Sequence, residues 1–221
     1  INFNRPLLHQ AKTLGKTVAT DVHVLSDIHD EFNREFMSCA DILFLSDEGI
    51  RGDYRDFLRA LGDTYGNRII VLGRGAEGAA MYLREESRIF ALPAVQVGEI
   101  VNTVGAGDAL FSGFLHHFAR GYRPLDALAR AQVFASAKIR VSGAANGFPA
   151  EEEMEMTLEA SEAPAEAMPE TSPAEPAEQK TRTLPGADCF TVVPESVTRT
   201  SADFTLTNEE DAVLALRSEY W

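Results

Sequence analysis

The sequence lacks three features, each of which would point to a particular class of protein. No apolar run approaches the roughly 20 residues of a membrane-spanning helix, which argues against a membrane protein. Only two cysteines occur, Cys39 and Cys189, which are too few for a disulfide framework and have no metal-ligand spacing, so we interpret them as reduced, unpaired thiols. Basic residues are outnumbered, 20 Lys and Arg against 34 Asp and Glu, which argues against a protein that coats nucleic acid. We therefore expect a cytoplasmic protein with reduced thiols and no nucleic-acid or membrane partner.

The net charge of −14 is distributed very unevenly along the 221 residues. Residues 1–150 hold 17 acidic and 16 basic side chains, a net of −1, whereas the last 71 residues hold 17 and 4, a net of −13. From Glu151 the composition turns to Glu, Ala and Pro, which is typical of a self-repelling, disordered segment. We expect a folded domain over 1–150, a disordered acidic linker over 151–183 and a short extension of unknown role over 184–221.

Apolar runs alternate with amphipathic segments throughout the first 150 residues. The runs show no polar alternation, as expected for strands of a parallel sheet that is covered on both faces. The pattern predicts strands over 17–21, 41–45, 68–72, 78–83 and 88–92, and helices over 7–14, 30–39, 54–61, 110–118 and 124–140. Residues 78–83 are also compatible with a helix, because Ala, Met and Leu favour one. The fold class predicted is α/β, with layers of helices around a mostly parallel central sheet.

A first glycine cluster follows one of these runs. Residues 73–78 read G-x-G-x-x-G, the spacing of a dinucleotide-binding fingerprint. That fingerprint must open a helix, yet only about ten residues separate Gly78 from the next expected strand, which is short for a crossover. Two other interpretations stay open, a tight turn between strands and a glycine turn that lines a nucleotide site in another fold. We favour the last of these.

A second cluster is more specific. Gly105, Ala106 and Gly107 precede an amphipathic helix, and Asp108 falls in its first turn. The start of a helix offers unpaired N–H groups and a partial positive charge, and small residues let an anion approach them closely. The adjacent carboxylate can accept a proton from an attacking hydroxyl during phosphoryl transfer. The alternative is that Asp108 only complements the helix dipole.

At this point the sequence resembles the ribokinase-like sugar kinases, also called the phosphofructokinase-B family. Their signature D-T-x-G-A-G-D, followed by an apolar helix, is similar to residues 102–114. Three further segments resemble family motifs in the same order along the chain. They are D-I-L-F-L-S-D-E at 41–48, V-L-G-R-G-A-E-G-A at 71–79 and S-G-A-A-N-G-F-P at 142–149.

The resemblance implies ATP-dependent phosphorylation of a hydroxyl on a sugar or nucleoside-like molecule. It makes Asp108 the catalytic base and the amides of Gly105, Ala106 and Gly107 an anion hole. The residues that it assigns to the nucleotide and a neighbouring K⁺ site are Gly75, Gly78, Thr103 and Asn146. Asp47 and Glu48 stand where the family binds Mg²⁺. A homodimer is also expected from the resemblance.

Some positions depart from the family pattern. Asn102 replaces the first Asp of the signature, which weakens the inferred K⁺ site, and Gly73 replaces a Thr that would contact phosphate. The family's N-x-x-E metal motif is reduced to Asp47-Glu48, which leaves a metal-bound water as the way to hold Mg²⁺.

The resemblance is confined to the C-terminal half of the family's kinase domain. The chain starts at Ile1 without Met or a signal-peptide pattern, and no segment resembles the family's glycine-rich sugar site or its lid. We therefore expect a fragment of a longer kinase that is inactive alone. The alternative is a non-catalytic, degenerate kinase-like module whose acidic tail binds a partner. The acceptor is not identified by the sequence.

Overall fold

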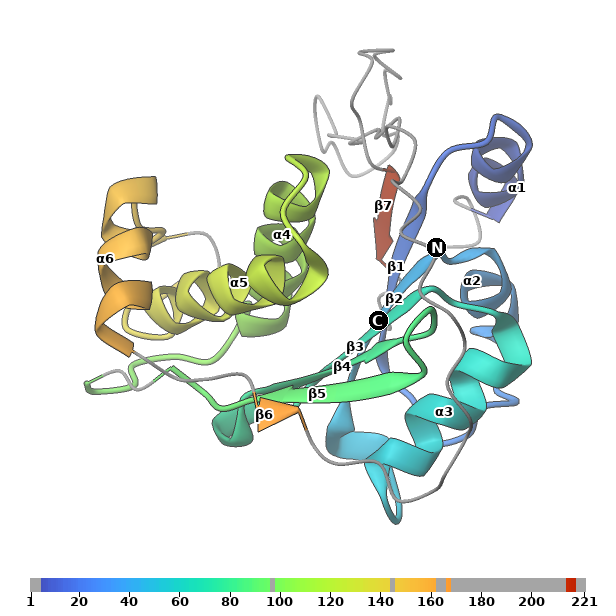
Figure 1. Ribbon diagram of the computed structural model, residues 1–221, viewed down its shortest axis with the longest axis horizontal. Helices are drawn as coiled ribbons and strands as arrows, with labels where there is room; N and C mark the ends of the chain where they lie inside the picture. The colour runs from blue at the N-terminus through green and yellow to red at the C-terminus, as the bar shows by residue number, and fades with distance from the viewer. Residues whose placement is uncertain (1–4, 96–97, 144–145, 162–165, 168–213, 218–221) are drawn as a thin grey trace.

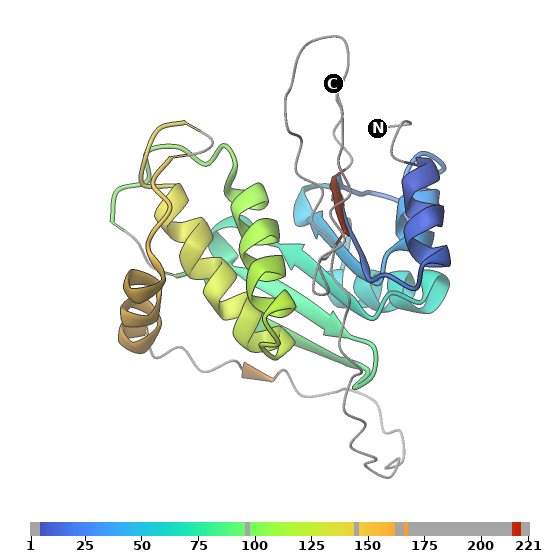
Figure 2. The ribbon, with the colours of Figure 1, turned by 90° about the horizontal axis from the view of Figure 1, so that it is seen from above.

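The computed structural model describes residues 5–95, 98–143, 146–161, 166–167 and 214–217. A central sheet separates two layers of helices (Figure 1). Helices α1 (Arg5–Thr13), α2 (Arg34–Cys39) and α3 (Tyr54–Tyr65) cover one face. Helices α4 (Ala106–Ala119) and α5 (Pro124–Lys138) cover the other, and α6 (Glu151–Ser161) packs outside α5. The view from above shows the same two layers (Figure 2). The layered α/β architecture predicted from the apolar runs is confirmed.

The sheet is mixed in strand direction. Strands β1 (Val18–Val24), β2 (Ile42–Ser46) and β3 (Ile69–Gly73) are parallel, and β4 (Ala79–Leu83) and β5 (Arg88–Leu92) continue as an antiparallel hairpin. Short strands end the sheet on both sides, β6 (Glu166–Ala167) beside β5 and β7 (Leu214–Arg217) beside β1. The strand order is β6-β5-β4-β3-β2-β1-β7. Residues 79–83 are therefore a strand, although their composition also favours helix.

Each of the strands β1 to β5 contributes to two separate cores because successive side chains point to opposite faces. In β2, Leu43 and Leu45 face α1, α2 and α3, whereas Ile42 and Phe44 face α4 and α5. All four are buried, which explains why the strand is a continuous apolar run without polar alternation.

Aromatic packing fixes α4 on the sheet. The Phe44 ring meets the rings of Phe111 and Phe114 edge to face, with centroids 4.9 and 5.3 Å apart. Glycine at 113 lets α5 approach closely, because a Cβ there would lie 3.2 Å from the Ala131 Cα. These contacts hold the start of α4 in a fixed position relative to β2 and β3.

Helix α6 differs from the disordered linker that the composition predicted to begin at Glu151. Residues 151–161 are helical, Met154 is buried, and Arg130 of α5 holds Glu155 in a two-pronged ion pair with N–O distances of 2.8 and 2.9 Å. Most of the remaining linker and extension, 168–213, lies outside the described residues. In the part of the chain that is described, no helix is both long enough and apolar enough to cross a membrane.

Candidate active site

The site forms where the three parallel strands end. Val24 pairs with Ser46 across β1 and β2, and Ser46 pairs with Gly73 across β2 and β3, so the three carboxyl ends lie side by side. The first turns of α4 reach the same edge, since Leu110 Cδ2 lies 3.8 Å from where a Cβ on Gly73 would be. In open α/β sheets this edge is where ligands bind.

The N-terminus of α4 is built by glycine. Gly105 caps the helix with φ of 83° and ψ of 4°, a left-handed conformation that glycine adopts without strain. Gly107 is exposed, and a Cβ there would meet nothing within 4 Å. The Ala106 amide, however, donates to the Thr103 carbonyl at 3.0 Å. Because this amide is already engaged, Ala106 offers a small side chain at the helix start and no free amide for the anion hole that was expected from Gly105, Ala106 and Gly107.

Asp108 sits in the first turn of α4, half-exposed beside these amides. Its backbone carbonyl accepts a hydrogen bond from the Ser112 hydroxyl at 2.7 Å, one turn further along. A carboxylate at this position complements the positive end of the helix dipole and is also placed to accept a proton from a bound hydroxyl.

The loop before α4 is tied to the end of α5. The amides of Val101 and Asn102 both donate to the Ile139 carbonyl, at 2.9 and 3.1 Å, and Asn102 Oδ1 accepts from the Val104 amide at 2.9 Å. Thr103 is exposed in this loop. Asn146 is exposed in the loop after α5, and its Nδ2 donates locally to the Ser142 carbonyl at 3.4 Å. The structure thus brings Thr103 next to Gly105, whereas Asn146 lies beyond α5.

The turn over residues 73–78 leads into a strand. A short 3-10 turn over Gly75–Glu77 is followed by the antiparallel β4, so the dinucleotide fingerprint is excluded because no helix follows the glycines. Gly75 has φ of 51° and open space around it. Gly78 has φ of 93°, and a Cβ there would lie 2.1 Å from the Leu92 carbonyl oxygen. Gly75 is therefore open to a ligand, while Gly78 is required by packing against the end of β5.

Two adjacent carboxylates follow β2. Asp47 is half-buried and Glu48 is exposed in the 3-10 turn Asp47–Gly49, where Ser46 Oγ accepts from the Glu48 amide at 3.5 Å. A search of the described residues finds no group of three or more His, Cys, Asp or Glu that could hold a metal ion alone. A pair of carboxylates suits Mg²⁺, which keeps several waters and shares phosphate oxygens.

Three further polar features lie at or near this region. The Arg74 guanidinium lies 4.4 Å from the Tyr54 ring centroid and pairs with Glu77. Arg74 stands between Gly73 and Gly75, so the sequence itself shows a cation in this glycine turn. At the end of β1, His23 has φ of 60° and its amide donates to Asp21 Oδ1 at 2.8 Å. Lys138 in the last turn of α5 is fully buried, and its amino group has no hydrogen-bond partner among the described residues. No sequence signal marks the burial of Lys138.

Comparison with known proteins places these features in a wider context. The family model described as pfkB family carbohydrate kinase matches residues 6–151. A curated relative, acarbose 7(IV)-phosphotransferase from Actinoplanes sp., is 32% identical over 129 residues, which is 58% of this chain and 42% of the relative. The chain thus spans less than half the length of this relative.

Solved structures show the same architecture. The microbiome-derived acarbose kinase Mak1 aligns with a TM-score of 0.66 and 22% identity, over 72% of this chain and 53% of that one. The Arabidopsis thaliana ribokinase complexed with ribose and ATP aligns with a TM-score of 0.59 and 19% identity, over 71% of this chain and 52% of that one. These alignments confirm the fold predicted from the motifs.

Proposed function

The chain belongs to the pfkB family of carbohydrate kinases, and we propose that it provides the phosphoryl-transfer site of an ATP-dependent kinase whose acceptor is a sugar or nucleoside-like hydroxyl. One observation carries this proposal: the glycine-lined N-terminus of α4, with Asp108 in its first turn, meets the carboxyl ends of β1, β2 and β3. That arrangement pairs an anion-binding site with a proton acceptor.

In this proposal the start of α4 receives the phosphates of ATP. The backbone N–H groups of its first turn and the helix dipole stabilise the negative charge that spreads over the transferred group. Asp108 takes the proton of the acceptor hydroxyl as that oxygen bonds to the γ-phosphorus and the bond to the ADP oxygen breaks. Gly107 keeps the approach open because it has no side chain.

Neighbouring residues bind the metal ions and the nucleotide in this proposal. Asp47 and Glu48 hold Mg²⁺ through bound water, and the ion supplies charge neutralisation of the phosphates. Gly75 and Gly78 shape the turn beside the nucleotide, with Arg74 as an added cation. Thr103 and Asn146 contribute oxygens near a K⁺ site. The packing of Gly78 against β5 supports an indirect role for that residue, in holding the turn rather than contacting the ligand.

The chain matches only part of the length of its relatives, and this affects the activity that we expect of it. Phosphoryl transfer depends on holding the acceptor in line with the γ-phosphate. Because the match covers 42% of the curated relative and 53% of acarbose kinase Mak1, we propose that the acceptor-holding residues lie outside the matched part. Residues 1–221 are then expected to bind ATP without phosphorylating a sugar.

Calorimetric titration tests nucleotide binding in residues 1–221. We expect Mg²⁺–ATP to bind and NAD not to bind. Gly107→Glu adds a carboxylate to the anion site without a steric clash and is expected to weaken ATP binding at least about tenfold. Gly98→Glu is the matched control, since it also has open space and no positive φ. Binding of NAD without ATP, or equal losses in both variants, would overturn the proposal.

A further inference from the structure

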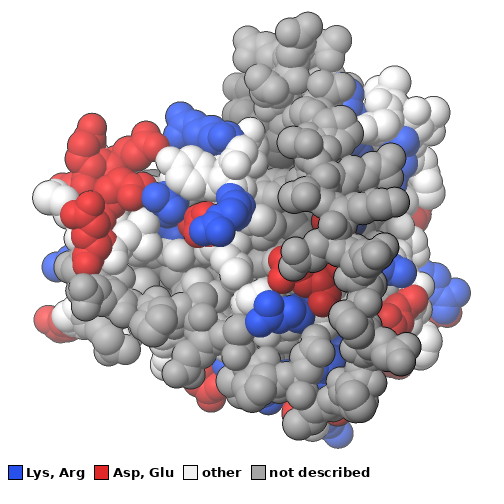
Figure 3. All heavy atoms as spheres, in the orientation of Figure 1, with Lys and Arg blue, Asp and Glu red and all other residues white. Residues whose placement is uncertain are grey.

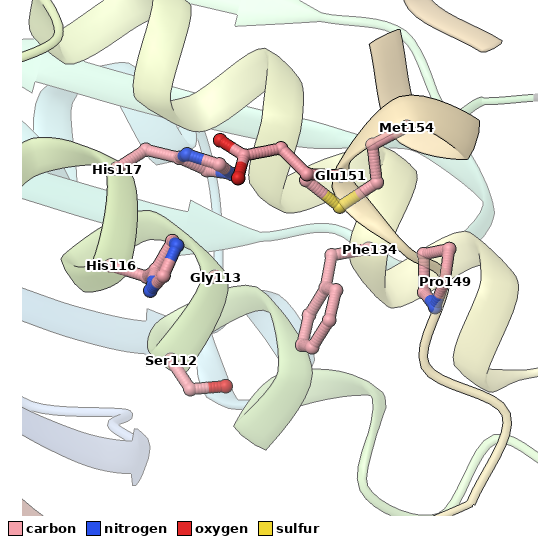
Figure 4. Close-up of a pocket in the computed structure, with 8 residues that line it drawn as sticks. All are labelled: Ser112, Gly113, His116, His117, Phe134, Pro149, Glu151 and Met154. Atoms are coloured by element: carbon pink, nitrogen blue, oxygen red, sulfur yellow. The ribbon is translucent and has the colours of Figure 1, made fainter. Parts of the chain in front are cut away.

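A pocket of about 310 Å³ opens between α4, α5 and the start of α6 (Figure 4). Its size is at the lower end of the range for small-molecule sites. Its lining on α4 begins at Ser112, four residues or about 6 Å along the helix axis after Asp108, and continues away from the helix start to His117. The pocket therefore lies beside the proposed phosphoryl-transfer site and does not include the start of α4. Its lining residues are Ser112, Gly113, His116, His117, Phe134, Pro149, Glu151 and Met154.

One side of the pocket is apolar and well fixed. Phe134 stacks on Phe148 with ring centroids 4.7 Å apart and an interplanar angle of 9°, which holds the Phe134 ring in place. Met154 is buried beside it, and Pro149 completes this side (Figure 4). An aromatic ring and a thioether offer favourable contacts to a flat, apolar ligand.

The other side carries a buried imidazole without a hydrogen bond. His117 is 1% exposed, and within the described residues neither of its ring nitrogens has a partner. Edge contacts to His116 and Tyr122, with centroids 5.0 and 5.3 Å away, hold the ring. Burial, reinforced by His116 and Arg130, lowers the pKa of His117, so the ring is neutral and offers one acceptor and one donor nitrogen. Such an unpaired buried group favours a ligand that satisfies it.

Negative charge gathers at the same side. Glu151 reaches toward His117 in Figure 4, and it belongs to a first turn of α6 that consists of three glutamates. The acidic surface over α6 is visible in Figure 3. Arg120 is the nearest opposing charge, 3.6 Å from the Glu151 carboxylate, and its guanidinium also donates to His116 Nε2. Glu151 therefore keeps acceptor capacity directed at the pocket.

We propose that this pocket binds a small planar organic amine or amidine. Its flat ring lies against Phe134 and Met154, and its N–H groups donate to the Glu151 carboxylate. The side chains that cover His117 move aside on binding, so that a further N–H group donates to the acceptor nitrogen of this buried ring. The inference stands independently of the proposed kinase function, because none of the lining residues belongs to the α4 N-terminus or the strand ends.

Benzamidine is a suitable probe, and benzoate is its control, being of similar shape and opposite charge. In residues 1–221, we expect titration followed by NMR to show saturable one-site binding of benzamidine and none of benzoate. Glu151→Gln is expected to weaken benzamidine binding by about tenfold or more, as for the loss of a charged hydrogen bond. Glu152→Gln, in the same helical turn but outside the pocket lining, is expected to bind like the wild type.

A second variant tests the imidazole. His117→Phe keeps the ring and removes both nitrogens, and we expect a further loss of about tenfold with unchanged thermal unfolding. If that variant does not fold, the comparison of Glu151→Gln with Glu152→Gln still tests the proposal, because both side chains are exposed and their replacement does not disturb the core. Absence of saturable binding, equal binding of benzoate, or unchanged affinity in Glu151→Gln would overturn the proposal.

Discussion

Replacing Gly78 with alanine tests how the turn at the edge of the active site is built. Gly78 has φ of 93° and ψ of −127°, a conformation that is almost confined to glycine. An added Cβ would lie 2.1 Å from the Leu92 carbonyl oxygen and 2.5 Å from the Ala94 nitrogen, both of them backbone atoms. The clash therefore cannot be relieved by rotating a side chain.

The expected magnitude has two parts. The backbone conformation costs an alanine about 1–3 kcal/mol. Displacing the backbone around Leu92 and Ala94 costs about another 1–3 kcal/mol, as in overpacked cores. The sum of about 2–6 kcal/mol is a large fraction of the 5–15 kcal/mol by which domains are typically stable. Gly75→Ala, three residues away, has φ of 51° and no atom within 4 Å, so it should cost only about 1–2 kcal/mol.

Urea unfolding followed by circular dichroism gives both free energies of unfolding. We expect Gly78→Ala to be clearly less stable than Gly75→Ala, with similar denaturant slopes for the two variants. Equal stability, or a more stable Gly78→Ala, would refute the packing explanation and return Gly78 to a role in direct ligand contact.

Two further predictions concern charged groups away from the turn. Hydrogen bonds from Arg5 and His9 lower the pKa of Glu35 below 4.5. The ionised Glu35 carboxylate therefore stabilises the fold at neutral pH, and this contribution to the free energy of unfolding is lost as the pH falls below 4.5. Glu35→Gln should therefore cost about 0.5–1 kcal/mol at pH 7 and almost nothing near about pH 3, and an equal loss at both values in urea titrations would contradict this. Lys138→Met removes a buried amino group that lacks a hydrogen bond among the described residues, and it should raise the free energy of unfolding by about 1–3 kcal/mol. A fall in the unfolding midpoint would show that the Lys138 amino group is satisfied in solution.

The strands of the fold were predictable because burial on both faces leaves a plain signature. Ile42–Leu45 and Ile69–Leu72 are buried at every position, so an uninterrupted apolar run marks them. Helix α6 was not predictable in the same way. Five of its eleven residues are Glu, which is also typical of a disordered acidic segment. Its contacts, through buried Met154 and the Arg130–Glu155 ion pair, depend on the position of α5.

The sequence indicates where the candidate site residues stand in the fold, but it does not indicate their hydrogen bonds. The local sequence indicates the strand ends, where the apolar runs stop. It also indicates the helix start before Asp108, because Gly105 adopts a left-handed conformation there that favours glycine. The engagement of the Ala106 amide by Thr103 depends on the turn geometry. The close approach of Gly78 to Leu92 depends on how two distant segments pack. Neither follows from residue spacing alone.

The account depends most on Asp108 as the base in phosphoryl transfer. Asp108→Asn should be made in the full-length gene product, with the rate of ATP-dependent phosphorylation measured over a panel of sugars and nucleosides and the ATP affinity measured by calorimetry. The amide keeps the side-chain shape but cannot accept the proton, so we expect kcat to fall by about 10²–10⁴-fold while the Kd for ATP changes less than about twofold. A near-normal kcat in this variant would leave Asp108 only its interaction with the helix dipole and would contradict the proposed mechanism.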